Sequence, residues 1–346
     1  MRCFKLRLMT LSGGRAIAAV SLALLLPAPL LCAAWVPSTW VQSTNDAPAT
    51  DPPPSLDLTP EEVSHLKTAV AAHDYVAAEK LLLNRVEQDP HAPPAAPLLA
   101  YLGSVYFLNH DFVNAAIAWK KSDAIRPLGP GLQFSLAMAY IRIGHPDWAR
   151  TALESLAARE TKNALYPYWL GRLDYDAHHY AEAIRHFQQA IALDPGMARA
   201  YDNLGLCYFY QNENDLAVKN FDTAIALDRT HPSAWPYLNR AVVMQFVGHT
   251  REAESDLREA LRLDPQLAEA HFRLGNVLQE RGQLDAAVQE QLAAVRLDDK
   301  YAEPHIALAH IYNQMGRKAD AQEEVKSYLR LHTGDHQPTA SAPDGK

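Results

Sequence analysis

The sequence predicts an all-α protein in which about eight helical hairpins stack into an α-solenoid. Composition is the first observation: 48% of the 346 residues are hydrophobic and 21% are charged. This supplies a large core and excludes a disordered or collagen-like chain. Secondly, a pattern returns every 34 residues from residue 96 onward, with one longer step of 36 after residue 198. Finally, two positions of each repeat hold only glycine or alanine, as expected where two helices cross closely.

Residues 1–34 are expected to be an export signal. Four basic residues and no acidic one lie in this segment, and an apolar run over residues 16–26 follows them. That run is too short to span a bilayer, but it matches the apolar middle of a secretory signal peptide, with small residues before a cleavage point after Ala34. An uncleaved membrane anchor, a lipid-modified Cys32 and an organellar transit peptide remain open. The expected location is therefore the exported side, periplasmic or secreted if the chain is bacterial, with attachment to the membrane as the alternative.

Two segments are predicted to lack packed structure. Residues 35–57 form a polar stretch broken by several prolines, which is typical of a linker. Residues 335–346 are mostly polar or small, include two prolines and a glycine, and are expected to be a disordered tail. The solenoid is therefore expected to cover residues 58–334. Its repeats are predicted near residues 59–92, 96–129, 130–163, 164–197, 198–231, 234–267, 268–301 and 302–334.

Small residues mark the predicted helix crossings. The eighth residues of the seven regular repeats are Gly103, Ala137, Gly171, Gly205, Ala241, Gly275 and Ala309. Their twentieth residues are Ala115, Ala149, Ala183, Ala217, Ala253, Ala287 and Ala321. The residue just before the eighth position is leucine in every regular repeat except one, which has Arg240 there. The earlier, less regular repeat begins with Thr59, Pro60 and Glu62, which predict a capped helix start.

These columns resemble the signature of the tetratricopeptide repeat (TPR) family. Tyr201, Leu204-Gly205, Tyr208, Ala217, Phe221 and Ala224 reproduce that signature almost in full. The resemblance implies a right-handed superhelix of antiparallel helix pairs, whose first helices line a concave groove that holds a partner. Gln291 stands where the family signature has an aromatic residue, and Arg240 stands where it has leucine. The least regular packing is expected around residue 234.

The histidines and cysteines are interpreted structurally. His73, His110 and His178 occupy the fifteenth position, where the other repeats have glycine or asparagine. This predicts a turn with positive φ and argues against a metal site at His178-His179. His271 and His305 are expected to be packing residues. Cys207 lies in an apolar column and is expected to be a buried, inert thiol.

The sequence indicates a non-catalytic protein that needs no cofactor or metal. Phosphate-binding loops, dinucleotide fingerprints, zinc-binding helices and nucleophile elbows are all missing from it. The formal charge is −8 and lysine and arginine form no stripe, which excludes nucleic acid as the expected partner. The expected partner is a protein or peptide segment.

The family resemblance implies which residues contact that partner, namely those at the second, fifth, ninth, twelfth and thirteenth positions. The aromatic, aliphatic and cationic candidates are Phe107, Phe134, Met138, Arg142, Tyr168, Arg172, Tyr175, Phe209, Tyr210, Trp235 and Phe246. The polar candidates farther along the chain are Asn276, His310 and Asn313. The first set is expected to hold apolar side chains, with Arg142 and Arg172 pairing with carboxylates. Alternatively, the rings pack the first helices against each other.

Three classes of function follow from these expectations. The leading hypothesis is an exported scaffold or adaptor of the cell envelope or secretory compartment, which binds a partner segment in the groove. The first alternative is a chaperone-like binder of exported clients, because half of the groove is aromatic. The second is an enzyme or the regulatory subunit of one.

Overall fold

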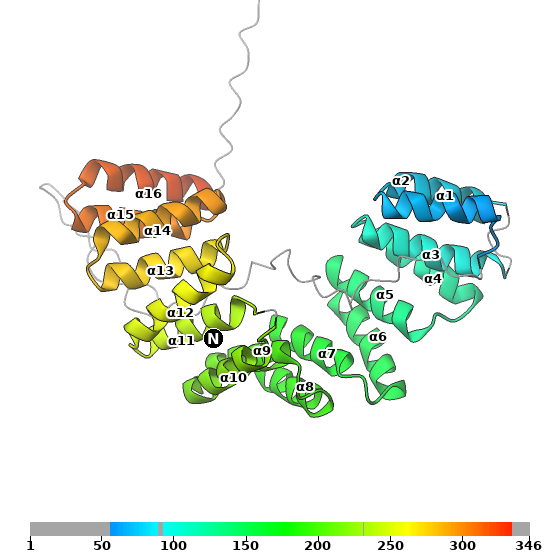
Figure 1. Ribbon diagram of the computed structural model, residues 1–346, viewed down its shortest axis with the longest axis horizontal. Helices are drawn as coiled ribbons and strands as arrows, with labels where there is room; N and C mark the ends of the chain where they lie inside the picture. The colour runs from blue at the N-terminus through cyan, green and yellow to red at the C-terminus, as the bar shows by residue number, and fades with distance from the viewer. Residues whose placement is uncertain (1–55, 89–92, 231, 334–346) are drawn as a thin grey trace, which may run out of the picture. The chain divides into compact units, whose positions relative to one another are not determined.

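The computed structural model describes residues 56–88, 93–230 and 232–333, all within one compact unit (Figure 1). The expected export signal, most of the expected linker and the expected tail lie outside the described residues. In the described part, sixteen helices alternate with turns and no residue lies in a β-strand. None of these helices is long and apolar enough to cross a membrane.

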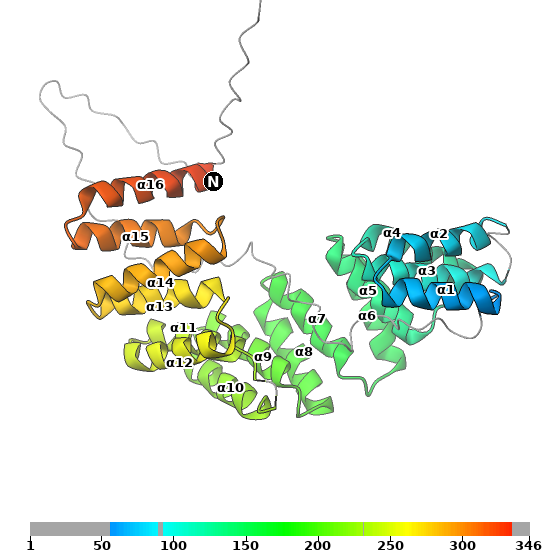
Figure 2. The ribbon, with the colours of Figure 1, turned by 45° about the horizontal axis from the view of Figure 1, so that its top comes forward.

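The helices form eight hairpins in chain order. Each odd-numbered helix packs against the next even-numbered helix, and each even-numbered helix packs against the start of the next hairpin (Figures 1 and 2). From α7 onward, the first helices α7, α9, α11, α13 and α15 also contact one another in sequence. The helices are α1 (Pro60–Ala71), α2 (Tyr75–Val86), α3 (Ala95–Leu108), α4 (Phe112–Ile125), α5 (Pro130–Arg142), α6 (Pro146–Arg159), α7 (Leu165–Asp176), α8 (Tyr180–Leu193), α9 (Ala198–Tyr210), α10 (Asn214–Leu227), α11 (Trp235–Phe246), α12 (Thr250–Leu263), α13 (Ala268–Glu280), α14 (Leu284–Leu297), α15 (Glu303–Gln314) and α16 (Lys318–Thr333). The predicted α-solenoid is confirmed.

The first helix begins as its sequence predicts. The Thr59 hydroxyl accepts a hydrogen bond from the Glu62 backbone N–H at 3.3 Å, and the Glu62 carboxylate accepts one from the Thr59 N–H at 2.7 Å. This capping box satisfies two backbone donors that a helix start leaves unpaired. The same hydrogen bond from the Thr59 backbone holds the pKa of Glu62 below its ordinary value.

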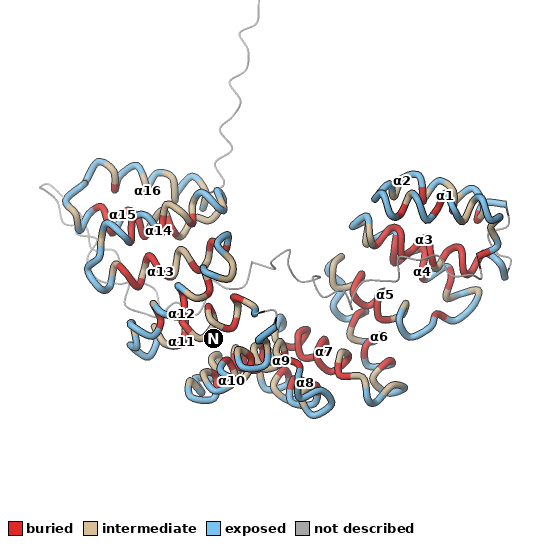
Figure 3. Tube along the Cα trace, in the orientation of Figure 1, coloured by how far each residue is buried: buried red, intermediate tan, exposed pale blue. Residues whose placement is uncertain are grey.

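The small residues pack where two helices of one hairpin meet. A Cβ atom on Gly103 would lie 2.5 Å from the Trp119 ring, and one on Gly205 would lie 2.6 Å from the Phe221 ring. Both rings are fully buried. The alanines of the twentieth position are buried as well, from Ala115 to Ala321. Buried segments accordingly recur along successive helices (Figure 3). The small side chains allow each large ring to fill the space between the helices.

The turns between paired helices have the predicted backbone conformation. The fifteenth-position residues all have positive φ: His73, His110, Gly144, His178, Asn212, Gly248, Gly282 and Gly316. The values lie between 58° and 85°. Glycine adopts this region freely, whereas histidine and asparagine occupy it at some cost.

Arg240, which stands where the other regular repeats have leucine, forms ion pairs with two neighbouring helices. Its guanidinium donates to both carboxylate oxygens of Asp256, at 2.8 and 2.6 Å, and to Asp222 at 2.5 Å. Hydrogen bonding to Asp256 is the main reason that the Arg240 pKa rises. Arg240 therefore connects α11 to α12 and to the preceding α10 through charge-assisted hydrogen bonds.

A second polar junction joins the third hairpin to the fourth. Asp174, on α7, is buried and lies within 2.6 Å of both Arg150 on α6 and His186 on α8. A buried carboxylate is tolerated when it is paired and hydrogen-bonded in this way. The repeat pattern did not reveal this junction, although His186 and Asp256 share the twenty-third position of their repeats.

His271 and His305 are more than packing residues. Their Nδ1 atoms lie 2.6 Å from carboxylate oxygens of Glu290 and Glu324, on the second helices of their hairpins. The hydrogen bond to Glu290 raises the pKa of His271. The expectation of simple packing is thus corrected, because each ring also pairs with a carboxylate across its hairpin.

Cys207 lies where its apolar column predicts. It is fully buried, and burial raises the pKa of its thiol to about 12. The thiol is therefore protonated at neutral pH and a poor nucleophile.

Candidate partner-binding site

The candidate site is the first-helix face, defined as the second, fifth, ninth, twelfth and thirteenth residues of the seven repeats that start at residues 96 to 302, which lie on the odd-numbered helices α3 to α15. The direct contacts among α7, α9, α11, α13 and α15 bring these positions of successive hairpins together. A chain segment crossing this face would meet side chains from several repeats, as in other stacked-repeat proteins.

Five of the candidate residues are buried within the solenoid: Phe107, Phe134, Met138, Tyr168 and Arg172. The Phe107 ring packs edge-on against Phe112 at 5.2 Å between centroids and lies 5.7 Å from Trp119. The Tyr168 ring lies 5.9 Å from the Phe187 ring, with an angle of 54° between their planes. In this structure these side chains therefore pack helices together, which is the alternative weighed for the rings in the sequence.

The two candidate arginines are engaged with this chain's own groups. The Arg172 guanidinium donates to Asn203 at 2.5 Å and to Asp176 at 3.3 Å. Only 4% of the Arg172 surface is exposed. A partner carboxylate would therefore have to displace Asn203 and Asp176 from the guanidinium. Arg142 is half-buried and lies 4.8 Å above the Phe112 ring. Arg142 thus remains closer to solvent than Arg172.

Five aromatic residues on the middle hairpins form what we call the aromatic strip: Tyr175, Tyr180, Phe209, Tyr210 and Phe246. The Tyr180 and Tyr210 rings stack at 4.8 Å, with 3° between their planes. Phe209 lies 5.9 Å from Tyr210 and 5.6 Å from Phe246. Phe246 ends the strip with 51% of its surface exposed. The packed rings therefore support one large apolar side chain in solvent.

Tyr180 was missed among the candidates, because it is the first residue of a second helix. A signal for it exists in the sequence: it follows the turn residue His178 by two positions, as Tyr75 follows His73. In both hairpins the ring lies beside the histidine, with centroids 5.8 to 5.9 Å apart. Burial raises the pKa of the neighbouring Tyr175, so its phenol stays neutral and apolar in character.

Beyond the strip the first-helix face becomes polar. Gln245, beside Phe246, donates to Glu280 at 2.7 Å, and Gln279 donates to Gln314 at 3.3 Å. Trp235 is half-buried at the start of α11, and Asn276 is half-buried on α13. His310 and Asn313 are exposed on α15. The change from rings to amides occurs within α11.

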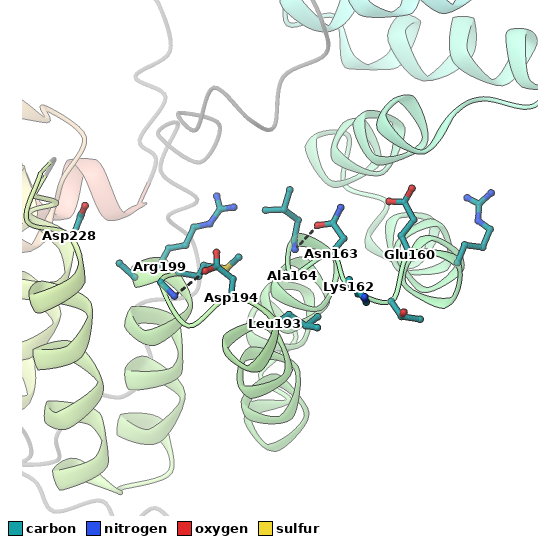
Figure 4. Close-up of a pocket in the computed structure, with 14 residues that line it drawn as sticks. Glu160, Lys162, Asn163, Ala164, Leu193, Asp194, Arg199 and Asp228 are labelled. Carbon is teal, nitrogen blue, oxygen red and sulfur yellow. Dashed lines mark hydrogen bonds between the residues drawn. The ribbon is translucent and has the colours of Figure 1, made fainter.

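A separate open groove of about 1120 Å³ lies between the loops that precede α7 and α9. Figure 4 shows Lys162 and Asn163 on one side of it and Asp194 and Arg199 on the other. Charges of both signs line the groove, and the Asp194 carboxylate accepts a hydrogen bond from the Gly196 backbone at 3.0 Å. The groove was not foreseen from the sequence, because irregular loops between repeats form it.

The part of the chain that the structure describes brings together no metal site. It contains no group of three or more histidine, cysteine or acidic side chains that could hold an ion. Each close His–carboxylate pair, such as His271 and Glu290, consists of only two possible metal ligands facing each other across a hairpin. A metal centre of the usual kind requires more ligands than such a pair supplies.

The stacked hairpins and the first-helix face define this protein as an α-solenoid. Three tetratricopeptide repeat models match the sequence, at residues 168–197, 196–266 and 245–302. The chain therefore contains tetratricopeptide repeats, and it has the fold of the protein-interaction scaffolds built from them. No curated protein matches the sequence.

Solved structures share this fold at low sequence identity. A tetratricopeptide repeat protein from Parabacteroides merdae is 17% identical, with a TM-score of 0.59, over 78% of this chain and 98% of that one. Yeast Tom70 is 16% identical, with a TM-score of 0.56, over 83% of this chain and 64% of that one. PilW, titled a type IV pilus biogenesis factor, is 22% identical, with a TM-score of 0.55, over 60% of this chain and 95% of that one. These similarities establish the architecture.

Proposed function

We propose that this chain is a non-catalytic scaffold that binds a segment of a partner protein along its first-helix face. The observation that carries the proposal is the aromatic strip, because it ends in Phe246 with 51% of that residue exposed. Adjacent Val247 is 41% exposed, which extends the apolar surface. Rings held rigidly by other rings lose little conformational entropy on binding, so they are effective interface anchors.

The partner that fits this surface is a segment with apolar side chains. The strip offers ring faces and edges from four helices, while Gln245 and Glu280 begin a hydrogen-bonding surface next to it. A bound segment would place apolar side chains against Phe209 and Phe246 and polar groups toward α13. Such an apolar centre with a polar surround is the usual composition of a protein interface.

Absence of enzymatic activity is part of the proposal. Cys207 is protonated at neutral pH, and the Asp174 and Asp256 carboxylates are tied to arginine side chains in the hairpin junctions. The two carboxylates stabilise the packing between helices. Turnover by the purified chain of any substrate would contradict this part of the proposal.

We further propose that the scaffold works on the exported side of a membrane. The basis is the charged leader and apolar run of residues 1–34 in the sequence. Membrane attachment through an uncleaved anchor or a lipid-modified Cys32 is the alternative. N-terminal sequencing of the native protein, combined with cell fractionation, distinguishes them: a mature chain starting at Trp35 supports cleavage, and a retained Met1 supports an anchor.

The test of binding combines capture with one substitution. Affinity capture on the purified chain is expected to yield one stoichiometric partner, whereas many apolar clients would favour the chaperone-like alternative. Phe246→Ala should then lower the affinity for the captured partner about tenfold or more, because it removes an exposed anchor. Its melting temperature should stay close to that of the wild type.

Leu216→Ala is the matched control for this substitution. Leu216 is 39% exposed but lies on the second helix α10, away from the first-helix face. It should leave both affinity and melting temperature unchanged. Equal losses of affinity with Phe246→Ala and Leu216→Ala would contradict the assignment of the site.

A further inference from the structure

Gln291 occupies a position that rings fill in other hairpins. The residues that lie against the crossing glycines Gly103, Gly171 and Gly205 are Trp119, Phe187 and Phe221, whereas the residue against Gly275 is Gln291. Gln291 is fully buried, and a Cβ atom on Gly275 would lie 2.6 Å from its Nε2 atom. A polar amide at this crossing costs stability unless it is hydrogen-bonded, so its bonds are informative.

The two hydrogen bonds of Gln291 fix the direction of its amide. Its Nε2 atom donates to the backbone oxygen of Phe272 at 3.1 Å and to Oδ1 of Asn276 at 2.8 Å. A backbone oxygen can only accept, so the atom facing Phe272 must be the Gln291 nitrogen. The Gln291 Oε1 atom is buried and has no hydrogen-bond partner among the described residues.

This arrangement also fixes the amide of Asn276. Because both protons of the Gln291 nitrogen are used, the Asn276 atom that faces it must be the acceptor Oδ1. The Asn276 Nδ2 atom therefore points away from Gln291. No group in the described part of the chain accepts a hydrogen bond from it.

Asn276 lies at the ninth position of its hairpin, on the first-helix face. It is half-buried on α13, which contacts both α11 and α15. Two charged side chains lie within about one turn of it on α13: Arg273, three residues earlier, donates to Glu269 at 2.6 Å, and Glu280, four residues later, accepts from Gln245. Because Arg273 is paired with a carboxylate of its own helix while Glu280 is bonded to a neutral amide, the charge of Glu280 disfavours a carboxylate ligand at Asn276 and leaves a neutral carbonyl oxygen as a suitable acceptor.

We propose that Gln291 is a positioning residue that orients Asn276 to donate a hydrogen bond to a main-chain carbonyl of the bound segment. This inference rests on the proposed function, since it names a contact of the same face. The donor is held in place before binding, which lowers the entropy lost when the segment docks. Gln291 thus contributes to binding without touching the partner.

The inference makes Gln291 important for binding and of little net effect on stability. Gln291→Met keeps the length of the side chain and removes both the unpaired Oε1 atom and the two hydrogen bonds of Nε2, so the melting temperature should stay within about 2–4 °C of the wild type. The same change should weaken binding about fivefold, because Asn276 is then free to rotate. A purely structural role for Gln291 predicts a clearly lower melting temperature without weaker binding.

The probe is a 12-residue peptide selected from a phage-displayed random library on the full chain. Its affinity is measured against wild type, Asn276→Ala, Gln291→Met and the double variant. Both single variants should weaken binding about fivefold, and the double variant should be no worse than Asn276→Ala, because the two residues act through one hydrogen bond. Gln188→Met, on the second helix α8, is the control and should leave binding unchanged.

Each other outcome overturns a defined statement. Weaker binding with Asn276→Ala but not with Gln291→Met overturns the positioning role and leaves the proposed function intact. Unchanged binding with Phe246→Ala, together with the expected losses at Asn276 and Gln291, overturns the aromatic anchor but supports this inference. If replacing the peptide's acidic residues by their amides abolishes the effect of Asn276→Ala, the acceptor is a carboxylate and the inference is wrong. Failure to select any peptide overturns both proposals.

Discussion

Gly205 and Phe221 make the contact on which hairpin packing depends: a Cβ atom on Gly205 would lie 2.6 Å from the buried Phe221 ring. The two residues belong to α9 and α10. Equivalent contacts join Gly103 to Trp119 in α3 and α4. The repeated small residue therefore sets how closely the two helices of a hairpin can approach.

Replacing Gly205 by alanine should destabilise the protein by about 1–3 kcal/mol, because the Phe221 ring has no room to move. Chemical denaturation measures the change. Gly131→Ala is the matched control, since nothing lies within 4 Å of a Cβ atom there. Gly131 also lies in a helix, so alanine should stabilise by up to about 1 kcal/mol. Stabilisation by both substitutions would contradict the close contact.

Arg240→Leu should destabilise the protein by about 2 kcal/mol or more, although leucine is the residue that other repeats have there. The substitution leaves the nearly buried Asp256 carboxylate without its two hydrogen bonds from Arg240. Adding Asp256→Ala should recover most of the loss, because the uncompensated charge is then gone. Urea unfolding of the single and double variants measures both effects. A stable single variant would show that the ion pair is dispensable.

The His271–Glu290 pair should make stability depend on pH from about pH 6.5 upward. The pKa of His271 is raised in the folded state, mainly by its hydrogen bond to Glu290. Its stabilisation is therefore fully present below the ordinary histidine pKa of about 6.5 and is lost as pH rises through the higher folded value. The stability difference between wild type and His271→Gln should be larger at pH 6 than at pH 8.5. Glu290→Gln should flatten this dependence, and an unchanged profile would argue against the pair.

Substitutions at His178 should follow its backbone conformation. Its φ is +60°, a region that glycine adopts freely and β-branched residues avoid. His178→Gly should be neutral or stabilising by up to about 1 kcal/mol, while His178→Val should destabilise by about 1–3 kcal/mol. Thermal unfolding of the two variants measures the difference. Equal melting temperatures would show that the turn relaxes to another conformation.

The candidate site was only partly foreseeable from the sequence. The repeat positions correctly marked Phe209 and Phe246 as first-helix residues, and both join the aromatic strip. They also marked Tyr168 and Arg172, which the structure buries. Position in a repeat specifies a helix face, but exposure depends on side chains contributed by the neighbouring hairpin. Asn203, which binds Arg172, comes from the next first helix and varies independently of the repeat pattern.

The sequence by itself determined the period, the paired helices, the close crossings and the positive-φ turns. Each of these follows from local spacing or from the size and backbone freedom of one residue. Each is therefore visible in the sequence as a residue type that recurs at one repeat position. The tertiary structure decided which rings are covered, which charges are paired and which way the Asn276 amide points. These properties arise from contacts between residues on different helices, and most of them, unlike the recurring His271–Glu290 and His305–Glu324 pairs, follow no repeat position.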